Sequence, residues 1–141
     1  MTTATSWSAV LAVQRAAHVS VHMLAAELTE LALTGSEINA LANLADGKGR
    51  TVSSLAAAAG VRATTMTSVL DRLERRDLIS RRPAPGDRRA VLVELTGTGT
   101  HAARAVGEAI ARLERHALAG LNAAATGSLR AGLDALAGVA R

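Results

Sequence analysis

Residues 51–95 carry two short helical segments followed by two strand-like segments, and this order constrains the fold more than any other part of the chain. Thr51 precedes an apolar helical segment at 52–59, and Gly60 follows at the position where helices commonly end. A second helix is predicted over about 63–76 from its apolar periodicity. Two helices separated by so short a turn form a helix-turn-helix.

The second of these helices is strongly amphipathic. Its apolar residues recur at steps of three and four, which predicts a buried face made of Met66, Val69, Leu70 and Leu73. Small hydroxyls and arginines occupy the opposite face and its flanks: Thr64, Thr65, Thr67, Ser68, Arg72 and Arg75. Small hydroxyls let such a helix lie deep in a DNA major groove, which is about 12 Å wide, and arginines reach base edges or phosphates. Asp71 lies among them, and we expect it to pair with Arg72 or Arg75 or to lie outside the groove.

The strand-like segments, 78–82 and 90–95, alternate apolar and polar residues and are joined by 83–89, which holds two prolines and a glycine. Such a joint cannot continue a helix, so an exposed loop is predicted, with Arg88 and Arg89 at its tip. A rigid basic tip reaches a minor groove beside the major-groove helix, where negative potential favours arginine. The whole order predicts a winged helix-turn-helix, a mainly α fold with a small β-hairpin wing.

Positive charge is concentrated in the same region. Residues 62–89 carry eight arginines and four acids, a net charge of +4, which equals that of the whole chain with its 16 bases and 12 acids. A phosphate backbone attracts such a cluster through the release of condensed counterions. The simpler alternative is a solvated basic face without a partner. Asp87 is not suited to meet phosphate, and we expect it to brace an arginine or the backbone of the turn.

Long helices are predicted on both sides of the winged region. Apolar residues recur at helical steps over 7–32. A capping-box pattern from Thr34 to Glu37 then starts a helix that ends near the turn-forming residues 46–49.

After the wing, Thr96 is placed to cap a helix over about 98–121, and Thr126 to start a last one. The chain has 141 residues, no Phe, no Tyr and a single Trp, so its own core is small. Helices this long outrun such a core, and their small and leucine-rich faces predict packing against a second copy. A monomer with intramolecular packing only is the alternative.

Composition excludes several classes of site. The absence of cysteine rules out disulfides and thiolate metal sites. No phosphate-binding loop, GxSxG or HExxH motif occurs, so we expect neither an enzyme nor a cofactor. No continuous apolar run approaches about 18 residues, and the N-terminus lacks the pattern of a secretory signal. We therefore expect a cytoplasmic protein without a membrane partner.

An ordered set of short motifs resembles the MarR family of bacterial winged-helix transcriptional regulators. The matching segments are Leu33-Thr34-x-x-Glu37-x-x-x-Leu41, Ser54-Leu55-Ala56 through Gly60-Val61, Leu70 through Ile79, Asp87-x-Arg89, and Leu95-Thr96-x-x-Gly99. The resemblance implies a homodimer in which Arg89 enters the minor groove, Asp87 orders the wing, and the hydroxyl face and Arg72 meet the major groove.

The resemblance also fixes the expected organisation. The chain length predicts a single domain over 1–141. Within it, the resemblance implies a DNA-binding lobe at 33–97 and a helical dimerisation region at 5–32 and 98–141. The chain departs from the family at Arg62, where a small polar cap residue commonly precedes the recognition helix. A side-chain cap contributes about 1 kcal/mol, so the helix start must rely on Thr64 or on tertiary contacts, while Arg62 is free to contact a phosphate.

Members of this family often release DNA when a small anionic or phenolic compound binds between the dimerisation helices and the DNA-binding lobe. On the first helix, the candidates for such an effector site are Trp7, Arg15, His18 and His22. The two histidines have the i, i+4 spacing of metal ligands, but ordinary helix histidines are the simpler interpretation, and we predict no metal site.

The sequence thus predicts a homodimeric repressor that binds a pseudo-palindromic site in double-stranded DNA. The alternative is a winged-helix protein-interaction or small-molecule-binding module without DNA binding. The sequence specifies neither the operator, the regulated genes, the effector, nor the choice between repression and activation.

Overall fold

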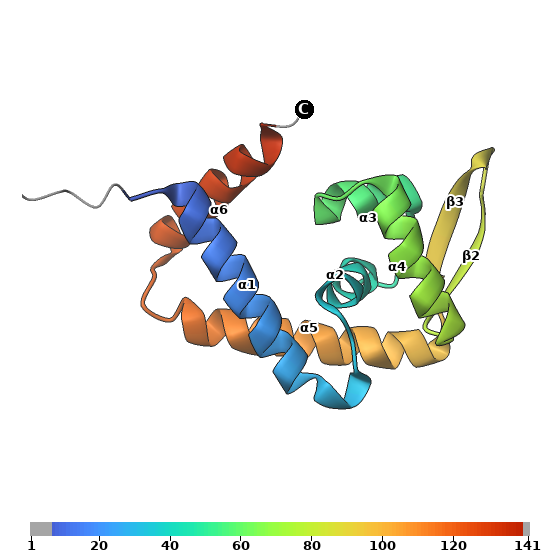
Figure 1. Ribbon diagram of the computed structural model, residues 1–141, viewed down its shortest axis with the longest axis horizontal. Helices are drawn as coiled ribbons and strands as arrows, with labels where there is room; N and C mark the ends of the chain where they lie inside the picture. The colour runs from blue at the N-terminus through green and yellow to red at the C-terminus, as the bar shows by residue number, and fades with distance from the viewer. Residues whose placement is uncertain (1–6, 140–141) are drawn as a thin grey trace, which may run out of the picture.

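The structure has the predicted order of a winged helix-turn-helix flanked by long helices (Figure 1). It is a computed structural model that describes residues 7–139, so the outermost residues of the predicted dimerisation region, 5–6 and 140–141, lie outside the described residues. The helices are α1 (Ala9–Glu27), α2 (Gly35–Leu44), α3 (Val52–Ala59), α4 (Ala63–Arg75), α5 (Gly97–Ala117) and α6 (Ala123–Gly138). The strands are β1 (Arg50–Thr51), β2 (Ile79–Ala84) and β3 (Asp87–Leu95).

The first helix is shorter than the predicted 7–32. α1 ends at Glu27, a single 3₁₀ turn covers Thr29–Leu31, and Ala32 adopts the left-handed conformation with φ 48°. This reversal buries Leu28 on one side of the turn and Leu33 on the other, which a continuous helix would not do. Helical periodicity continued through the turn and therefore concealed it.

The capping signals of the winged lobe are confirmed. The Thr34 hydroxyl accepts the backbone N–H of Glu37, and the Glu37 carboxylate accepts the N–H of Thr34, which makes a complete capping box at α2. The Thr51 hydroxyl caps α3 by accepting the N–H of Ser54, and Gly60 ends the helix in the left-handed conformation. Both boundaries of α3 agree with the prediction.

The wing is longer than predicted and has a third strand. β2 and β3 pair antiparallel, and β1 adds to the other edge of β3 through Arg50 and Thr51. Pro83 lies within β2 rather than in a loop, which is possible because β2 is an edge strand with an irregularity after Pro83. The expected loop 83–89 is reduced to a tight turn at Pro85 and Gly86.

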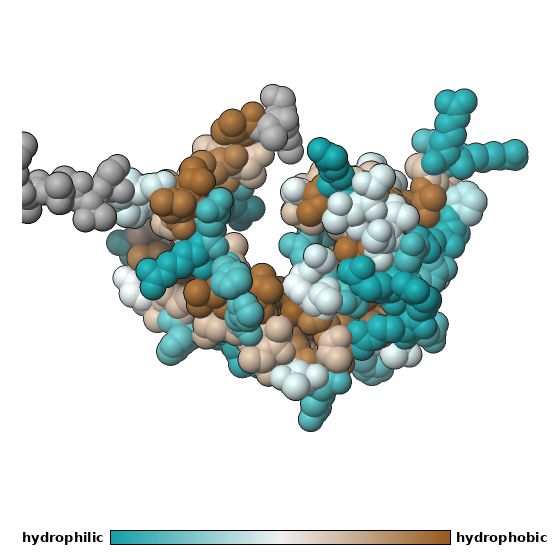
Figure 2. Space-filling model, viewed as in Figure 1, coloured by the Kyte–Doolittle hydropathy of each residue, from teal (hydrophilic) through white to brown (hydrophobic). Residues whose placement is uncertain are grey.

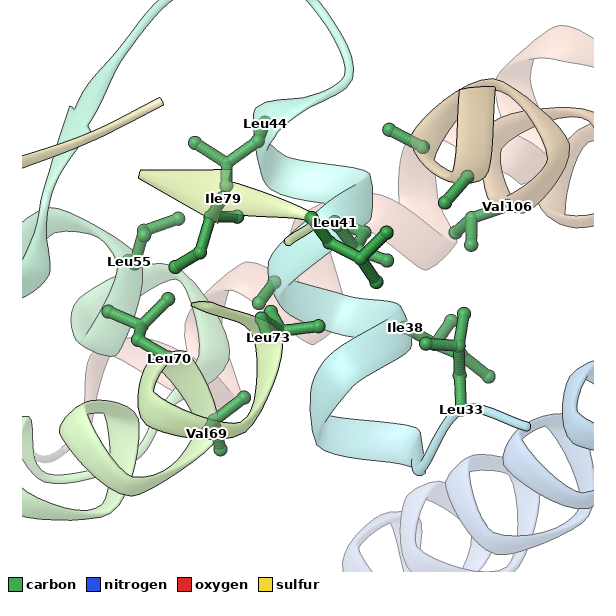
Figure 3. Close-up of a cluster of buried hydrophobic side chains, with 14 of the residues drawn as sticks. Leu33, Ile38, Leu41, Leu44, Leu55, Val69, Leu70, Leu73, Ile79 and Val106 are labelled. Atoms are coloured by element: carbon green, nitrogen blue, oxygen red, sulfur yellow. The ribbon is translucent and has the colours of Figure 1, made fainter. Parts of the chain in front are cut away.

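The core lies where the helices of the lobe meet the base of the sheet. Figure 3 shows side chains from α2, α3, α4 and α5 converging there with Ile79 of β2. The largest fully buried side chains are Leu41, Leu44, Leu55, Met66, Leu70, Leu73, Ile79, Val93 and Val106. The recognition helix and the base of the wing therefore share one core.

The helical arm outside this core is formed by α1, the far part of α5, and α6 (Figure 1). None of the described residues of α1 or α6 is buried, and Figure 2 shows hydrophobic side chains gathered along this arm. Large exposed apolar residues recur on both helices: Val10, Leu11, Val19, Val21, Met23, Leu129, Leu133 and Leu136. Exposed apolar faces of this extent are typical of interaction surfaces.

Two details of the arm differ from the prediction. α6 starts after Asn122, whose side chain accepts the N–H of Ala125, whereas the Thr126 hydroxyl donates to the carbonyl of Asn122 inside the helix. α5 ends at Ala117 rather than near 121.

By length and composition alone, α1 is apolar enough on average to cross a membrane, although its apolar residues do not form a continuous run. Arg15, His18 and His22 interrupt its apolar surface, and it contacts α5 and α2. α1 therefore suits a contact with another subunit. The cytoplasmic location of the protein stays a prediction.

Candidate nucleic-acid interface

The recognition helix α4 presents one face to the core and the other to solvent. Met66, Val69, Leu70 and Leu73 are buried, as predicted. The N-cap position is held by Arg62, whose side chain makes no capping hydrogen bond, although its carbonyl accepts the Met66 N–H as the first hydrogen bond of the helix. The Arg62 guanidinium is therefore not engaged in capping.

The exposed face of α4 carries the predicted hydroxyl residues at its start. Thr64, Thr65, Thr67 and Ser68 are all exposed. The Thr67 hydroxyl donates to the carbonyl of Ala63 at 2.9 Å, and that of Ser68 lies 3.4 Å from the carbonyl of Thr64. With its proton used in this way, the Thr67 oxygen offers lone pairs outward and its methyl group offers an apolar contact.

Arg72 turns towards α2 rather than straight outward. Its Nε is 3.9 Å from Oε1 of Glu37, and Nη1 of Arg76 is 3.6 Å from Oε2 of the same residue. Glu37 is only 3 % exposed, so a buried carboxylate lies beneath the recognition helix and is balanced by two partly exposed arginines. Arg72 remains at the edge of the reading face, while Arg75 lies on it with its Nε donating to the carbonyl of Asp71.

Asp71 has a different partner from either predicted arginine. Its carboxylate is 2.7 Å from Nη2 of Arg81 on β2, and the same guanidinium bonds to Glu74, one turn further along α4. Partial burial by itself would lower the pKa of Arg81, but hydrogen bonds and charges from both carboxylates raise it above its ordinary value. The guanidinium therefore stays charged and ties the wing to the recognition helix.

The outer part of the wing is braced within itself. Arg82 pairs with Glu94 across the sheet at 2.8 Å, and this hydrogen bond and its charge raise the pKa of Arg82. The Asp87 carboxylate accepts the backbone N–H of Arg89 at 3.0 Å, which confirms the predicted bracing of the turn. Arg88 and Arg89 are exposed, and Figure 2 shows hydrophilic side chains extending from the wing tip.

The predicted effector residues are not brought together. Trp7 is 79 % exposed and lines an apolar groove of about 670 Å³ between α1 and α6, with Leu129, Leu133 and Leu136. Arg15, His18 and His22 do not line this groove. The rings of His18 and His22 meet edge to face at 4.5 Å, and within residues 7–139 no cluster of three or more His, Asp or Glu side chains forms a metal site.

A second pocket lies where α1 meets the winged lobe. It has a volume of about 340 Å³ and is lined by Val21 of α1, by the start of α2, and by Val61, Thr65 and Val69 around the helix-turn-helix. Ser36, Asn39 and Thr65 supply its hydrogen-bonding groups. Sequence reasoning missed this pocket because its walls come from four separate segments.

Glu37 and Arg81 were also missed as parts of the interface. Glu37 was predicted only as a capping residue, and its pairing with α4 depends on how two helices cross. Arg81 was counted only in the basic cluster. Its position seven and ten residues after Glu74 and Asp71 carries no helical signal, because a turn and a strand intervene.

Comparisons with known proteins agree with this geometry. The model of the MarR family matches residues 33–91. The crystal structure of NadR in complex with 4-hydroxyphenylacetate is similar over 99 % of both chains, with 21 % identity and a TM-score of 0.82. A probable transcriptional regulator from Pseudomonas aeruginosa is 27 % identical, with a TM-score of 0.74, over 92 % of this chain and 96 % of that chain.

A mutant MarR from E. coli complexed with operator DNA is 23 % identical, with a TM-score of 0.72, over 88 % of this chain and 89 % of that chain. No curated protein sequence matches significantly. The predicted winged helix-turn-helix fold is confirmed by these structures.

Proposed function

Because this chain belongs to the MarR family, we propose that it is a homodimeric, sequence-specific DNA-binding regulator that acts as a repressor and is released by a small molecule. The family is one of transcriptional regulators and not of enzymes. The observation that carries the proposal is the joint exposure of a recognition helix and a basic wing tip on one lobe. Because the recognition helix and the base of the wing pack on one core, a single lobe can bind a major groove and the adjoining minor groove together.

The proposed contacts divide between reading and positioning. Residues on and beside α4 meet the major groove and its phosphates: Arg62, Thr64, Thr65, Thr67, Ser68, Arg72 and Arg75. At the wing, Arg89 enters the minor groove, Arg88 meets the backbone, and Asp87 holds the turn. The outward lone pairs of Thr67 suit the amino groups of adenine or cytosine, and its methyl group suits thymine.

A second copy completes the arm. The exposed apolar faces of α1 and α6 and the groove between them have the character of a subunit interface rather than of free surface. Two lobes related by a two-fold axis would bind half-sites about one helical turn, 10–10.5 bp, apart. The structural similarity to an operator complex of MarR supports this arrangement.

The effector site is proposed at the pocket between α1 and the winged lobe. NadR is similar over almost its whole length and was crystallised with 4-hydroxyphenylacetate, a small phenolic acid. The pocket has mixed apolar and hydrogen-bonding walls, and Thr65 and Val69 of its wall belong to the recognition helix. A compound bound there would contact α4 directly and would favour the conformation of α4 that it binds more tightly.

Selection of bound sequences from random duplex DNA with the purified full chain tests the function. We expect enrichment of one pseudo-palindromic motif, and loss of that enrichment in the Arg88→Ala/Arg89→Ala variant. Arg130→Ala is the matched control, because Arg130 is exposed on α6 and away from the lobe. Failure of the unaltered protein to enrich any motif would favour the interaction module without DNA binding.

A further inference from the structure

The wing is held to the recognition helix at one polar junction. Arg81, in the middle of β2, bonds to both Asp71 and Glu74 of α4, and its side chain is 25 % exposed. Below this junction the hairpin is anchored by the buried side chains of Ile79 and Val93. Beyond it, the described ion pair and turn bond, Arg82 to Glu94 and Asp87 to Arg89, lie within the hairpin itself.

The two carboxylates stand in an unfavourable place for a DNA-binding surface. Asp71 follows Ser68 by three residues and precedes Arg75 by four, so it lies on the same face of α4 as these reading residues. An unpaired carboxylate there would repel the phosphate backbone, which carries one negative charge per about 1.7 Å of duplex. The Arg81 guanidinium pairs with both Asp71 and Glu74, so its positive charge offsets part of their negative charge.

From this junction we infer that Arg81 is a positioning residue for DNA binding: it sets the wing against α4 and screens two carboxylates, so that helix and wing tip engage adjoining grooves together. The inference rests on the proposed DNA binding. It assigns Arg81 a role different from that of Arg88 and Arg89, because its Nε and Nη2 already donate to carboxylates of α4.

Arg82 provides a matched control on the same strand. It is the next residue and is also a paired arginine, but it has one carboxylate partner where Arg81 has two, and that partner, Glu94, belongs to the sheet and not to α4. Arg81→Gln and Arg82→Gln therefore remove the same charge and the same kind of bond. Only the first removes a bond between the wing and the recognition helix.

The experiment combines DNA affinity with a measurement on the free protein. In the parent, Arg89→Ala is expected to weaken operator binding by about tenfold or more. In the Arg81→Gln background, the same Arg89→Ala change should weaken binding less than about threefold, because a wing that is no longer fixed against α4 does not hold Arg89 in the groove. In the Arg82→Gln background the full effect of Arg89→Ala should remain.

Amide hydrogen exchange of the free protein separates the inference from the proposed function. Protection of residues 79–95 should fall in Arg81→Gln but not in Arg82→Gln, while α5 stays protected in both. An undiminished effect of Arg89→Ala in the Arg81→Gln background, or unchanged protection of the wing, would overturn the inference. If the parent protein binds no DNA, the proposed function fails, and the exchange comparison still decides whether Arg81 holds the wing.

A third variant separates the two effects of Arg81. Arg81→Gln/Asp71→Asn/Glu74→Gln removes the carboxylates as well, so it should recover affinity lost to charge repulsion. The contribution of Arg89 should stay small in this variant, because the junction is still missing. Full recovery of that contribution would show that Arg81 acts by charge screening alone and would overturn its positioning role.

Discussion

Gly99 of α5 lies directly against the backbone carbonyl group of Leu78, so that a Cβ atom at position 99 would overlap this carbonyl. The contact joins the start of α5 to the start of the wing, and the Leu78 carbonyl also accepts the N–H of Thr96. Since backbone atoms cannot step aside as a flexible side chain can, we expect Gly99→Ala to destabilise the protein by about 1–3 kcal/mol or more. Urea unfolding of the purified variant would measure the loss.

Gly97→Ala is the control for this effect. Gly97 is the first residue of the same helix, and a Cβ atom added there would meet no other atom within 4 Å. Its replacement should therefore change the free energy of unfolding by less than about 0.5 kcal/mol. Equal stability of the two variants would contradict the close approach at Gly99.

Ala32 offers a stabilising substitution. Its φ of 48° is in the left-handed region, which costs an L-residue about 1–2 kcal/mol, whereas glycine loses only about 0.5–1 kcal/mol in chain entropy. We therefore expect Ala32→Gly to raise the free energy of unfolding by up to about 1 kcal/mol. Ala45→Gly, at a residue in the right-handed helical region, should lower it instead. Destabilisation by both changes would place Ala32 in an ordinary conformation.

The local elements of the lobe could be predicted because their signals are local. The capping box at Thr34, the cap at Thr51 and the stop at Gly60 each depend on residues within one turn. The break after α1 could not, because Leu24, Leu28 and Leu31 keep helical spacing through the 3₁₀ turn, as they would in a continuous helix. The two-residue strand β1 is too short to show any periodicity and exists through its pairing with β3.

The parts of the candidate site differ in the same way. The exposed face of α4 and the wing tip follow from helical periodicity and turn chemistry. The partners of the charged residues do not, because Glu37 meets Arg72 and Arg76 only where α2 packs against α4, and Asp71 meets Arg81 only where β2 packs against α4. Pairing of Asp71 with Arg72 or Arg75 was the natural expectation from spacing on one helix, and tertiary geometry replaced it with Arg81.

Arg72 lies 3.9 Å from the Glu37 carboxylate, and we propose that it also meets the major groove. We expect Arg72→Ala to relax base preference at one position in each half-site by about 1–3 kcal/mol, because arginine contacts guanine through two hydrogen bonds. Competition binding with single-base operator variants would measure this preference. A uniform loss of affinity at every position would show instead that Arg72 supports α4 through Glu37.

The basic cluster predicts a strong dependence of DNA binding on salt. Release of counterions from 6–10 phosphates would lower affinity by about 10³–10⁵ between 50 and 200 mM salt. Removing one backbone-contacting charge, as in Arg88→Ala, should reduce the slope of log affinity against log salt by about one. Arg130→Ala on α6 should leave the slope unchanged, and binding that is indifferent to salt would exclude a phosphate-based interface.

Leu133 tests the proposed subunit contact. It lies on α6 in the groove shared with α1 and is 42 % exposed, so a glutamate there would place a charge in an apolar interface. Because burial of one leucine contributes about 1.5–3 kcal/mol, we expect Leu133→Glu to raise the dimer dissociation constant by at least about tenfold in sedimentation experiments. Ala131→Glu introduces the same residue at a position of α6 that does not line the groove, and it should leave the dimer intact. Dissociation by both variants would indicate unfolding of α6, whereas dissociation by neither would place the subunit contact elsewhere.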